Sequence, residues 1–292
     1  MVNEIEELLC ELGICNKETI APFYPRVRDS EDILVLKCQK SGVIFLSRSD
    51  HINISHYERS EGFSYWCSQN RKQAALKGFE DDHRRFAEFK STICNKIWLD
   101  VGTGSGGILD LMSRYALDTI CVEPQKQARE CLMESGYEVY TSVDEIPRTD
   151  IEIVTMFHVL EHLVDPIAAL KNIRDKMKGD AKIIIEVPHA NDFLISFLNI
   201  EAFKAFTFWS EHLILHTRQS LKAFLEAAGF HNVHIKGYQR YPLANHLYWL
   251  KEGKPGGHIY WNQLRTPELE SAYANMVAAL DKTDTLIANA DA

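Results

Sequence analysis

The glycines at positions 102, 104, 106 and 107 are the residues whose type and spacing most directly suggest chemistry. They follow the apolar run Trp98–Val101 in the segment WLDVGTGSGGILD. A strand that ends in glycines before a helix lets a nucleotide approach the backbone, because no side chain blocks it. Two glycine spacings overlap here, G-x-G-x-x-G and G-x-G-x-G, so the glycines alone do not identify the nucleotide.

Two cofactors fit this loop. The first spacing is the dinucleotide fingerprint of nicotinamide and flavin enzymes, and the second is the first motif of S-adenosylmethionine-dependent methyltransferases. Glu123 ends the next apolar run, DTICVE, and its carboxylate can accept hydrogen bonds from the ribose hydroxyls of either cofactor. Asp100 separates them better, because its carboxylate attracts the ammonium and sulfonium groups of S-adenosylmethionine and repels a pyrophosphate. A tight strand–helix turn without any ligand is the third alternative.

Alternating strand and helix patterns must position these residues from Lys96 onward. The expected strands are KIWLDV, DTICVE, IEIVTMF, AKIIIEV and finally FHNVHIKGYQRY. The expected helices are ILDLMSRYA, PQKQARECLMES from Pro124 to Gly136, a helix capped by Asp165 with Leu170, Ile173 and Met177 on its buried face, and RQSLKAFLEAA between Thr217 and Gly229. This alternation predicts an α/β fold with a doubly wound, mostly parallel, Rossmann-like sheet of the seven-stranded type.

The flanking regions are expected to be appendages. Residues 1–90 form an N-terminal α+β appendage with an acidic amphipathic helix, a hairpin in ILVLKCQKSGVIFL that turns at Ser41-Gly42, an aromatic segment at 56–66, and a solvated helix in FEDDHRRFAEFK. The core spans 91–241, and residues 242–292 form a helical C-terminal extension with a helix from about Pro267. A lid insertion is expected at 189–216. Its aromatic side chains either roof a pocket or belong to an ordinary core, and they are Phe203, Phe206, Phe208 and Trp209.

The segment TMFHVLEHLVDP, residues 155–166, brings these observations together. LDVGTGSG, Glu123, FHVLEHLVDP, IIIEVPHA and SEHLILHTRQSLKAFLEAAGF follow one another between Trp98 and Tyr241, about half of the chain. In this order they resemble the class I S-adenosylmethionine-dependent methyltransferases, particularly the small-molecule branch. The resemblance implies S-adenosylmethionine as cofactor, with Gly102, Thr103 and Gly104 along its methionine part, Glu123 on its ribose, Asp144 near its adenine, and Phe157 and His158 in contact with it.

The catalytic candidates come from the end of the expected lid. Glu211 and His212 lie in a W-x-E-H-L setting that occurs in relatives that methylate sugars, including deoxysugar C-methyltransferases in which the histidine is the base. A neutral imidazole beside a carboxylate is a sound base near neutral pH. We therefore predict His212 as base, Glu211 as its partner and His162 as a further catalytic residue. The alternative is that these residues only order the lid and the loop around Glu161 by hydrogen bonds.

Two patterns raise the question of a metal. His158-Val-Leu-Glu161-His162 matches the H-x-x-E-H signature of zinc hydrolases, which needs both histidines on one helical face, whereas His158 ends an expected strand. Relatives also often begin with paired C-x-x-C-G zinc knuckles. Here Cys38-Gln-Lys-Ser41-Gly42 keeps only one cysteine of the second knuckle. No metal is expected at either place.

Composition limits the remaining functions. The formal net charge of −9 disfavours nonspecific nucleic-acid binding, and neither a basic signal-peptide start nor an apolar run of membrane-spanning length is present. We expect a cytoplasmic protein with no membrane and no nucleic-acid partner, and the oligomeric state stays open. The predicted function is methyl transfer from S-adenosylmethionine to a small-molecule substrate, foremost a nucleotide-activated sugar or glycan precursor, with O-methylation favoured. The rival functions are an NAD-dependent oxidoreductase and a non-catalytic partner protein that keeps the glycines but lacks a connected pocket.

Overall fold

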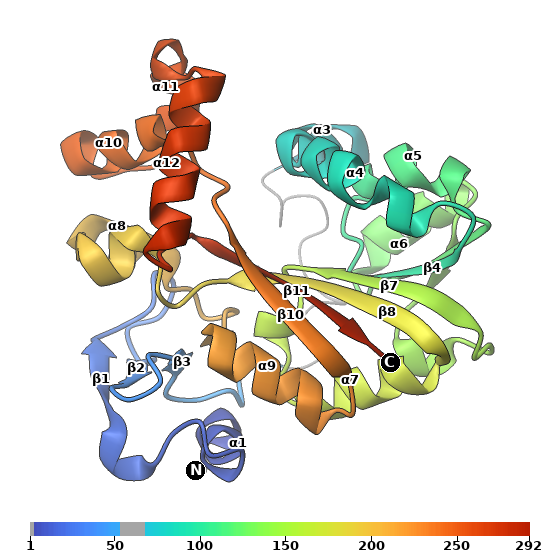
Figure 1. The fold of residues 1–292 in the computed structure, drawn as a ribbon, viewed down its shortest axis with the longest axis horizontal. Helices are drawn as coiled ribbons and strands as arrows, with labels where there is room; N and C mark the ends of the chain where they lie inside the picture. The colour runs from blue at the N-terminus through green and yellow to red at the C-terminus, as the bar shows by residue number, and fades with distance from the viewer. Residues whose placement is uncertain (1–2, 53–67) are drawn as a thin grey trace.

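A seven-stranded sheet forms the centre of the protein, whose computed structural model describes residues 3–52 and 68–292 (Figure 1). The aromatic segment at 56–66 lies outside these ranges. The strand order is β10-β11-β8-β7-β4-β5-β6, parallel from β8 to β6 and antiparallel on both sides of β11. The strands are β4 (Ile97–Val101), β5 (Asp118–Val122), β6 (Glu138–Tyr140), β7 (Ile151–Phe157), β8 (Met177–Pro188), β10 (His231–Tyr238) and β11 (Thr285–Asp291). The predicted doubly wound, mostly parallel sheet is confirmed.

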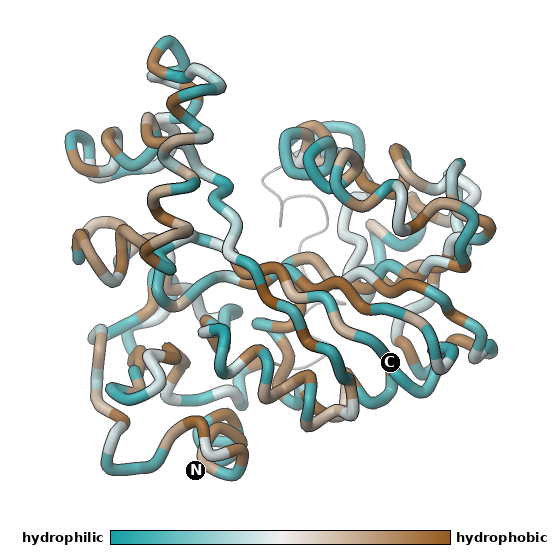
Figure 2. Tube along the Cα trace, viewed as in Figure 1, coloured by the Kyte–Doolittle hydropathy of each residue, from teal (hydrophilic) through white to brown (hydrophobic). Residues whose placement is uncertain are grey.

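Helices cover both faces of the sheet. In Figure 1, α3 to α6 lie on one side of the strands, and α7 and α9 lie on the other. Their bounds are α3 (Arg71–Lys77), α4 (Phe79–Ile93), α5 (Gly107–Met112), α6 (Lys126–Glu134), α7 (Pro166–Asp175) and α9 (Arg218–Ala227). Because both faces are covered, the central strands carry continuous apolar runs, which appear as the brown stretches of Figure 2. All five residues of β4 are buried.

Caps explain where the helices begin, and here the sequence was informative. The Asp165 carboxylate accepts a hydrogen bond from the Ala168 amide, and Thr217 forms a capping box with Ser220, as predicted. Two expectations were wrong. Helix α6 starts at Lys126 with Gln125 as its cap, after Pro124, and Met177 is the first residue of β8 rather than part of α7.

Helix α4 is present where predicted, but it is not solvated on all sides. Asp82 and Arg85 are buried, and both Arg84 and Arg85 form ion pairs with Glu186 on β8. Charged residues in a helix usually indicate a solvent-facing surface, and they mislead here because their partners lie on a distant strand. The helix therefore forms a charged clamp over the carboxyl end of the sheet.

The C-terminal region contributes helices and also a strand. An arm of α10 (Leu243–Glu252), α11 (Gly257–Tyr260), a 3₁₀ turn at Asn262–Leu264 and α12 (Pro267–Ala279) projects from the sheet, and the chain then returns as β11 (Figure 1). The helix from Pro267 was predicted. Strand β11 was not, so FHNVHIKGYQRY is not the last strand. The segment TLIANAD contains alanine and asparagine in place of a β-branched run, and pairing on both sides makes it a strand.

A second, antiparallel sheet links the N-terminal region to the core. Its order is β1 (Ile20–Tyr24), β2 (Val35–Cys38), β3 (Ile44–Leu46) and β9 (Ile214–Leu215), beside α1 (Glu4–Glu11) and a 3₁₀ turn at Lys17–Thr19. The predicted hairpin is confirmed, with Gly42 at φ +77° in its turn. Strand β9 belongs to the segment expected as a lid, which also contains a π-helical turn (Phe193–Phe197) and α8 (Glu201–Thr207). This pairing fixes the position of His212, two residues before β9.

Among the described residues, no helix combines the length and the apolar character that crossing a bilayer demands.

Candidate active site

A cavity of about 1000 Å³ lies over the carboxyl ends of β4, β5 and β7. It brings together residues that are far apart in the sequence, from Ile52 to Arg240. Of the predicted site residues, those that line it are Asp100, Gly102, Thr103, Gly104, Glu123, Asp144, Phe157, His158, His162 and His212. Glu211 is the exception, since it lies behind His162. The cavity wall is also formed by residues that sequence reasoning missed, Lys77, Asp81, Asp82, Arg85 and Arg240.

The glycine loop needs its glycines for two separate reasons. Gly102 and Gly104 have φ angles of +73° and +59°, which side chains rarely allow. A Cβ atom at Gly102 would also lie 2.3 Å from Cγ2 of Val159, in the loop after β7. Without a side chain at Gly102, the glycine loop packs directly against Val159 after β7. Gly102, Thr103 and Gly104 also line the cavity.

Glu123 is held in place by the glycine loop. Its Oε2 accepts a hydrogen bond from the Gly104 amide at 2.6 Å, and its Oε1 accepts one from the Gln125 amide at 2.8 Å. Burial raises the pKa of this carboxyl to about 7, although both amides favour the charged form. Each oxygen keeps a lone pair for a ligand hydroxyl, which is the arrangement expected for a ribose-binding acid.

Asp100 lines the cavity, but its oxygens are already occupied by hydroxyl groups. Oδ1 accepts a hydrogen bond from Thr155 and Oδ2 accepts one from Thr103, each at 2.5 Å. Thr155 in turn accepts a hydrogen bond from the Trp98 indole at 2.7 Å. Burial raises the pKa of Asp100 to about 6. The Asp100 carboxyl group, which was expected to attract a cation, therefore also orders the glycine loop through Thr103.

Asp144 and Phe157 both line the cavity. Asp144 is exposed in a 3₁₀ turn at Val143–Glu145 and accepts a hydrogen bond from Asn172 at 3.1 Å. Phe157 ends β7 and stacks on Phe89, while the Arg85 guanidinium lies 4.3 Å from the centre of its ring.

His158 has an unusual backbone and two firm partners. Its φ angle is +57°, rare for a side chain of this size. Arg240 Nη1 lies 3.1 Å from Nε2, and Glu161 Oε1 lies 3.3 Å from Nδ1. Since the guanidinium can only donate, Nε2 is the acceptor and Nδ1 carries the proton. Burial, with Arg240 and Arg85 next in effect, lowers the pKa of His158 well below its usual value, so the ring is neutral.

Arg240 itself gave no sequence signal, because it lies in a loop after β10 and outside any motif. It forms an ion pair with Asp81 of α4 through two hydrogen bonds. This pair joins the base of the C-terminal arm to α4 across the cavity wall.

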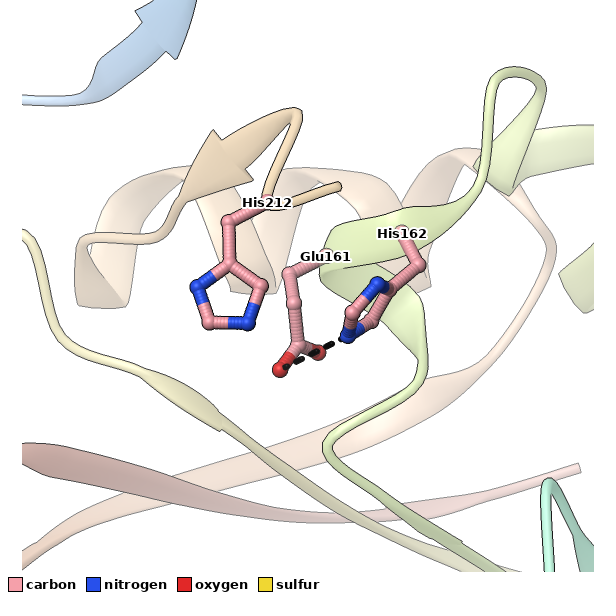
Figure 3. Close-up of side chains that lie close together, drawn as sticks. All are labelled: Glu161, His162 and His212. Carbon is pink, nitrogen blue, oxygen red and sulfur yellow. Dashed lines mark ion pairs between the residues drawn. The ribbon is translucent and has the colours of Figure 1, made fainter. Parts of the chain in front are cut away.

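Glu161, His162 and His212 form a compact group (Figure 3), and the two histidines line the cavity. The rings of His162 and His212 have their centres 4.9 Å apart, and His162 Nε2 lies 3.9 Å from Glu161 Oε1. A hydrogen bond of 2.9 Å from the Leu213 amide to the Glu161 carbonyl fastens the two loops together. The H-x-x-E-H residues do not lie on one helical face, because His158 ends a strand and Glu161 and His162 lie in a 3₁₀ turn.

The predicted pairing of Glu211 with His212 has to be corrected. The Glu211 carboxylate lies 4.0 Å from Nδ1 of His162, so its neighbour in space is His162 rather than the next residue in sequence. Glu211 lies in a turn in which the His212 amide donates a hydrogen bond to the Trp209 carbonyl, and this turn gives the two adjacent side chains different neighbours. The carboxylate beside His212 is Glu161. Of the two alternatives for the aromatic side chains of the expected lid, the structure favours ordinary packing, because none of the four lines the cavity. Phe208 packs on Phe23 and Tyr24, and Phe203 and Phe206 pack on Trp249.

Burial is the main cause of the shifted pKa values of Glu161, His162 and His212. It raises the pKa of Glu161 to about 8 and lowers the pKa of His212 to about 3. It also lowers the pKa of His162 well below its usual value. Both imidazoles are therefore neutral at physiological pH, as expected from the sequence, but the His212 ring is a weaker base than an ordinary histidine.

Comparison with known proteins agrees with this geometry. Residues 67–235, more than half of the chain, match the model of a methyltransferase domain family. No curated protein matches the sequence. Among solved structures, a chain in the complex of the Haloferax volcanii Trm112 methyltransferase activator with a putative methyltransferase is 16% identical, with a TM-score of 0.52 over 79% of this chain and 97% of that one. A SAM-dependent methyltransferase from Archaeoglobus fulgidus is 18% identical, with a TM-score of 0.49 over 79% and 98% of the two chains.

The family match decides between the two cofactors that the glycine spacings left open. The matched span contains the glycine loop, Glu123 and the whole LEHLVDP segment. An oxidoreductase would reuse the glycines without this combination. The chain belongs to the methyltransferase domain family, and it is a class I enzyme that takes its methyl group from S-adenosylmethionine.

Proposed function

We propose that this enzyme methylates a small molecule bound beside Glu161, His162 and His212, and that the methylated atom is a hydroxyl oxygen. The observation that carries the proposal is the continuity of the cavity. The same cavity is lined by Glu123 and the glycine loop at one end and by His162 and His212 at the other. Its volume of about 1000 Å³ lies at the upper end of the range for small-molecule pockets, so it has room for a cofactor and an acceptor together.

The roles of the cofactor-side residues follow from their geometry. Glu123 would accept hydrogen bonds from the ribose, and Gly102, Thr103 and Gly104 would lie along the methionine part. Asp144, exposed beside Asn172, would lie near the adenine. Phe157 ends β7 and His158 follows it, and both would contact the cofactor. The S-adenosylmethionine sulfonium supplies the methyl group when bound.

Methyl transfer to a hydroxyl requires alignment and removal of one proton. The carbon–sulfur bond breaks as the oxygen–carbon bond forms, and the hydroxyl proton must leave. His212 is the proposed proton acceptor from sequence, and its place in the cavity wall supports contact with the acceptor. Its neutral ring has a lone pair available, although its low pKa limits its strength as a base.

The acceptor class is proposed from the W-x-E-H-L resemblance, which points to a nucleotide-activated sugar or another glycan precursor and so to carbohydrate biosynthesis. Transfer of a labelled methyl group from S-adenosylmethionine to a panel of nucleotide sugars tests this directly, with Glu123→Ala as the control that loses cofactor binding. Labelled product whose methyl group is shown by mass spectrometry to be on oxygen is the expected result. If the protein binds the cofactor but no sugar is labelled, the acceptor class is wrong while methyl transfer stands. A cavity that binds neither S-adenosylmethionine nor its demethylated product would instead support a non-catalytic partner protein.

A further inference from the structure

We infer that Glu161, His162 and His212 bind a divalent transition-metal ion, foremost zinc, at the acceptor end of the cavity. The three side chains offer one carboxylate oxygen and two imidazole nitrogens, and these atoms all lie within 4.8 Å of one another (Figure 3). Two histidines and one glutamate are a ligand set of catalytic zinc sites, which keep a position open for water or substrate. The inference builds on the proposed function, because the open position would face the acceptor.

The Glu161 carboxyl group shows the clearest need for a ligand. It is fully buried, and its Oε2 atom has no hydrogen-bond partner. An unpartnered buried acceptor costs about 1–3 kcal/mol, so proteins rarely retain one without a use. Its other oxygen, Oε1, already accepts the His158 Nδ1–H at 3.3 Å. A cation on Oε2 would complete the coordination of this carboxylate.

The imidazoles are oriented as metal ligands usually are. His162 hydrogen-bonds the backbone of Glu211, and its Nδ1 lies on that side, 4.0 Å from the Glu211 carboxylate. Its Nε2 is then directed toward Glu161 at 3.9 Å. A histidine that gives one nitrogen to a backbone or carboxylate partner presents the other, with a fixed tautomer, to a metal. The His212 ring stands nearly perpendicular to that of His162, at 84°, which directs the two rings toward different corners of a site.

The framework around the three ligands is built before any ion arrives. The hydrogen bond between the Leu213 amide and the Glu161 carbonyl fixes His212 relative to Glu161, and β9 fixes the same segment to the N-terminal sheet. Ligand atoms around a tetrahedral zinc ion lie about 3.3 Å apart, given bonds of about 2.0–2.1 Å. The ligand atoms, which lie within 4.8 Å of one another, therefore need to approach by at most about 1.5 Å, which rotation of the side chains can supply.

The nearby charges do not block a cation. Arg240, the closest guanidinium to His158, is neutralised by Asp81. Arg28 acts on His212 but stacks on the ring of Trp209 at 4.4 Å. On the other side, the Glu211 carboxyl group lies 4.0 Å from Nδ1 of His162.

Such an ion would change the part played by His212. An acceptor hydroxyl bound to a divalent cation loses its proton near neutral pH, as zinc-bound water does, and the proton passes to solvent at the open side of the cavity. The resulting oxygen attacks the methyl carbon, the carbon–sulfur bond breaks and sulfur takes the electron pair. His212 then acts as a metal ligand, and the weakness of its ring as a base no longer limits the reaction.

The sequence did not reveal this site, because the expectation of no metal considered only the H-x-x-E-H pattern and the cysteine knuckle around Cys38. That pattern pairs His158 with His162. The structure replaces His158 by His212, which lies 50 positions after His162 in the sequence and which no spacing rule connects to it.

Cobalt binding to the purified, chelator-treated protein is the direct test, because Co²⁺ reports its coordination by visible absorption without any turnover. We expect one equivalent of Co²⁺ with the spectrum of a four- or five-coordinate site, displaced by Zn²⁺. Glu161→Gln, His162→Ala and His212→Ala should each weaken binding by at least about 100-fold, since even outer-shell changes weaken metal sites 10–100-fold. His234→Ala, at an exposed histidine on β10, is the matched control and should bind Co²⁺ as the wild type does.

The outcomes separate this inference from the proposed function. Unsaturable or absent Co²⁺ binding by the folded wild type, or equal binding by the three ligand variants, overturns the metal site and leaves His212 as base. Titration with S-adenosylhomocysteine serves as the second measurement, and circular dichroism checks that each variant is folded. Failure of S-adenosylhomocysteine to bind the wild type overturns the proposed function whatever the cobalt result. Metal binding that is lost in the ligand variants while cofactor affinity stays within about twofold supports the metal site.

Discussion

Glu123 and Gly104 are joined by a hydrogen bond of 2.6 Å from the glycine amide to the carboxylate, so the acid expected to bind the cofactor ribose also orders the glycine loop. The two residues lie on different βα connections of the sheet. One contact therefore links the two halves of the cofactor end of the cavity before the cofactor arrives. This double role makes Glu123 the most informative position for testing cofactor binding.

Replacing Glu123 with alanine is expected to weaken S-adenosylmethionine and S-adenosylhomocysteine by about 1.5–3 kcal/mol, the range for hydrogen bonds to a charged group. Isothermal titration calorimetry measures this directly. Glu123→Gln keeps an acceptor oxygen and should lose less. Unchanged affinity in the alanine variant would remove Glu123 from the cofactor site.

The affinity for S-adenosylhomocysteine should depend on pH through the same carboxyl group. Burial raises the pKa of Glu123 to about 7, and the charged form is the better acceptor for ribose hydroxyls. Affinity is therefore expected to rise about tenfold between about pH 6 and pH 8. Calorimetry across this range, with Glu123→Gln as the pH-independent control, checks the sign. A flat profile in the wild type would mean that another group binds the ribose.

Removing Glu186 of β8, the partner of Arg84 and Arg85 in the charged clamp, is expected to lower the stability of the protein strongly. Arg85 donates to Glu186 Oε2 from Nη2 at 2.8 Å, and Arg84 donates to both carboxylate oxygens. Although burial opposes it, these guanidinium groups lower the pKa of Glu186. Glu186→Ala leaves two buried cations without this partner and should lower the free energy of unfolding by about 3–5 kcal/mol. Urea denaturation measures the loss, and a loss no larger than that of an exposed pair such as Lys222–Glu226 would contradict the clamp.

His212→Gln should separate the chemical step from cofactor binding. The side chain lines the acceptor end of the cavity, so S-adenosylmethionine affinity should stay within about twofold while turnover falls by roughly 10²–10⁴. This result is expected whether His212 is a base or a metal ligand, and cobalt binding then distinguishes the two. Wild-type turnover in the variant would remove His212 from both roles.

The buried Asp192 carboxyl group is expected to make the free energy of unfolding depend on pH. Burial, with the nearby Asp284, raises the pKa of Asp192 from 3.8 to about 8, so the folded state holds a proton that the unfolded state releases. This contribution to stability is complete below the unfolded pKa and is lost as pH rises through the folded one. Buried histidines such as His216 and His246 have lowered pKa values, so they act in the opposite sense only below about pH 6.5.

The measurable window therefore lies between about pH 6.5 and pH 8, where Asp192 lowers the free energy of unfolding by up to about 1.4 kcal/mol per pH unit. Asp192→Asn keeps an oxygen for the Leu194 and Ile195 amides and removes the titration. Urea denaturation of both proteins should show a shallower decline in the variant. Parallel curves would show that Asp192 is charged in the folded protein.

Much of the fold and of the cofactor end could be predicted, because local rules determine them. The strand before Gly102, the caps at Asp165 and Thr217 and the acid at Glu123 all follow from short segments with strong periodicity or turn chemistry. These segments are also the ones that resemble the family. Helix α4 was located correctly for the same reason.

The acceptor end could not be predicted, because contacts between distant segments build it. Glu211 and His212 are adjacent in sequence, yet the turn that contains them gives their side chains different neighbours. Arg240 reaches His158 from a loop after β10, and the two arginines of α4 reach Glu186 across about 100 positions. Neither the charge pattern nor the spacing of residues along the chain indicates such distant pairs.

The arm of α10 to α12 has a consequence for how the sheet assembles. Tyr238 at the end of β10 and Thr285 at the start of β11 are register partners, so the whole arm lies inside one antiparallel connection. Closing a long loop before its strands pair carries an entropic penalty and slows folding. The arm's own contacts shorten that loop, because the Asn245 side chain accepts hydrogen bonds from the Gly256 and Gly257 amides and Tyr273 hydrogen-bonds His246. With its ends drawn together at Asp284, which accepts the Arg240 and Tyr241 amides, the arm behaves as an elaborated hairpin turn. The arm therefore leads the chain back to the sheet, where β11 pairs between β10 and β8.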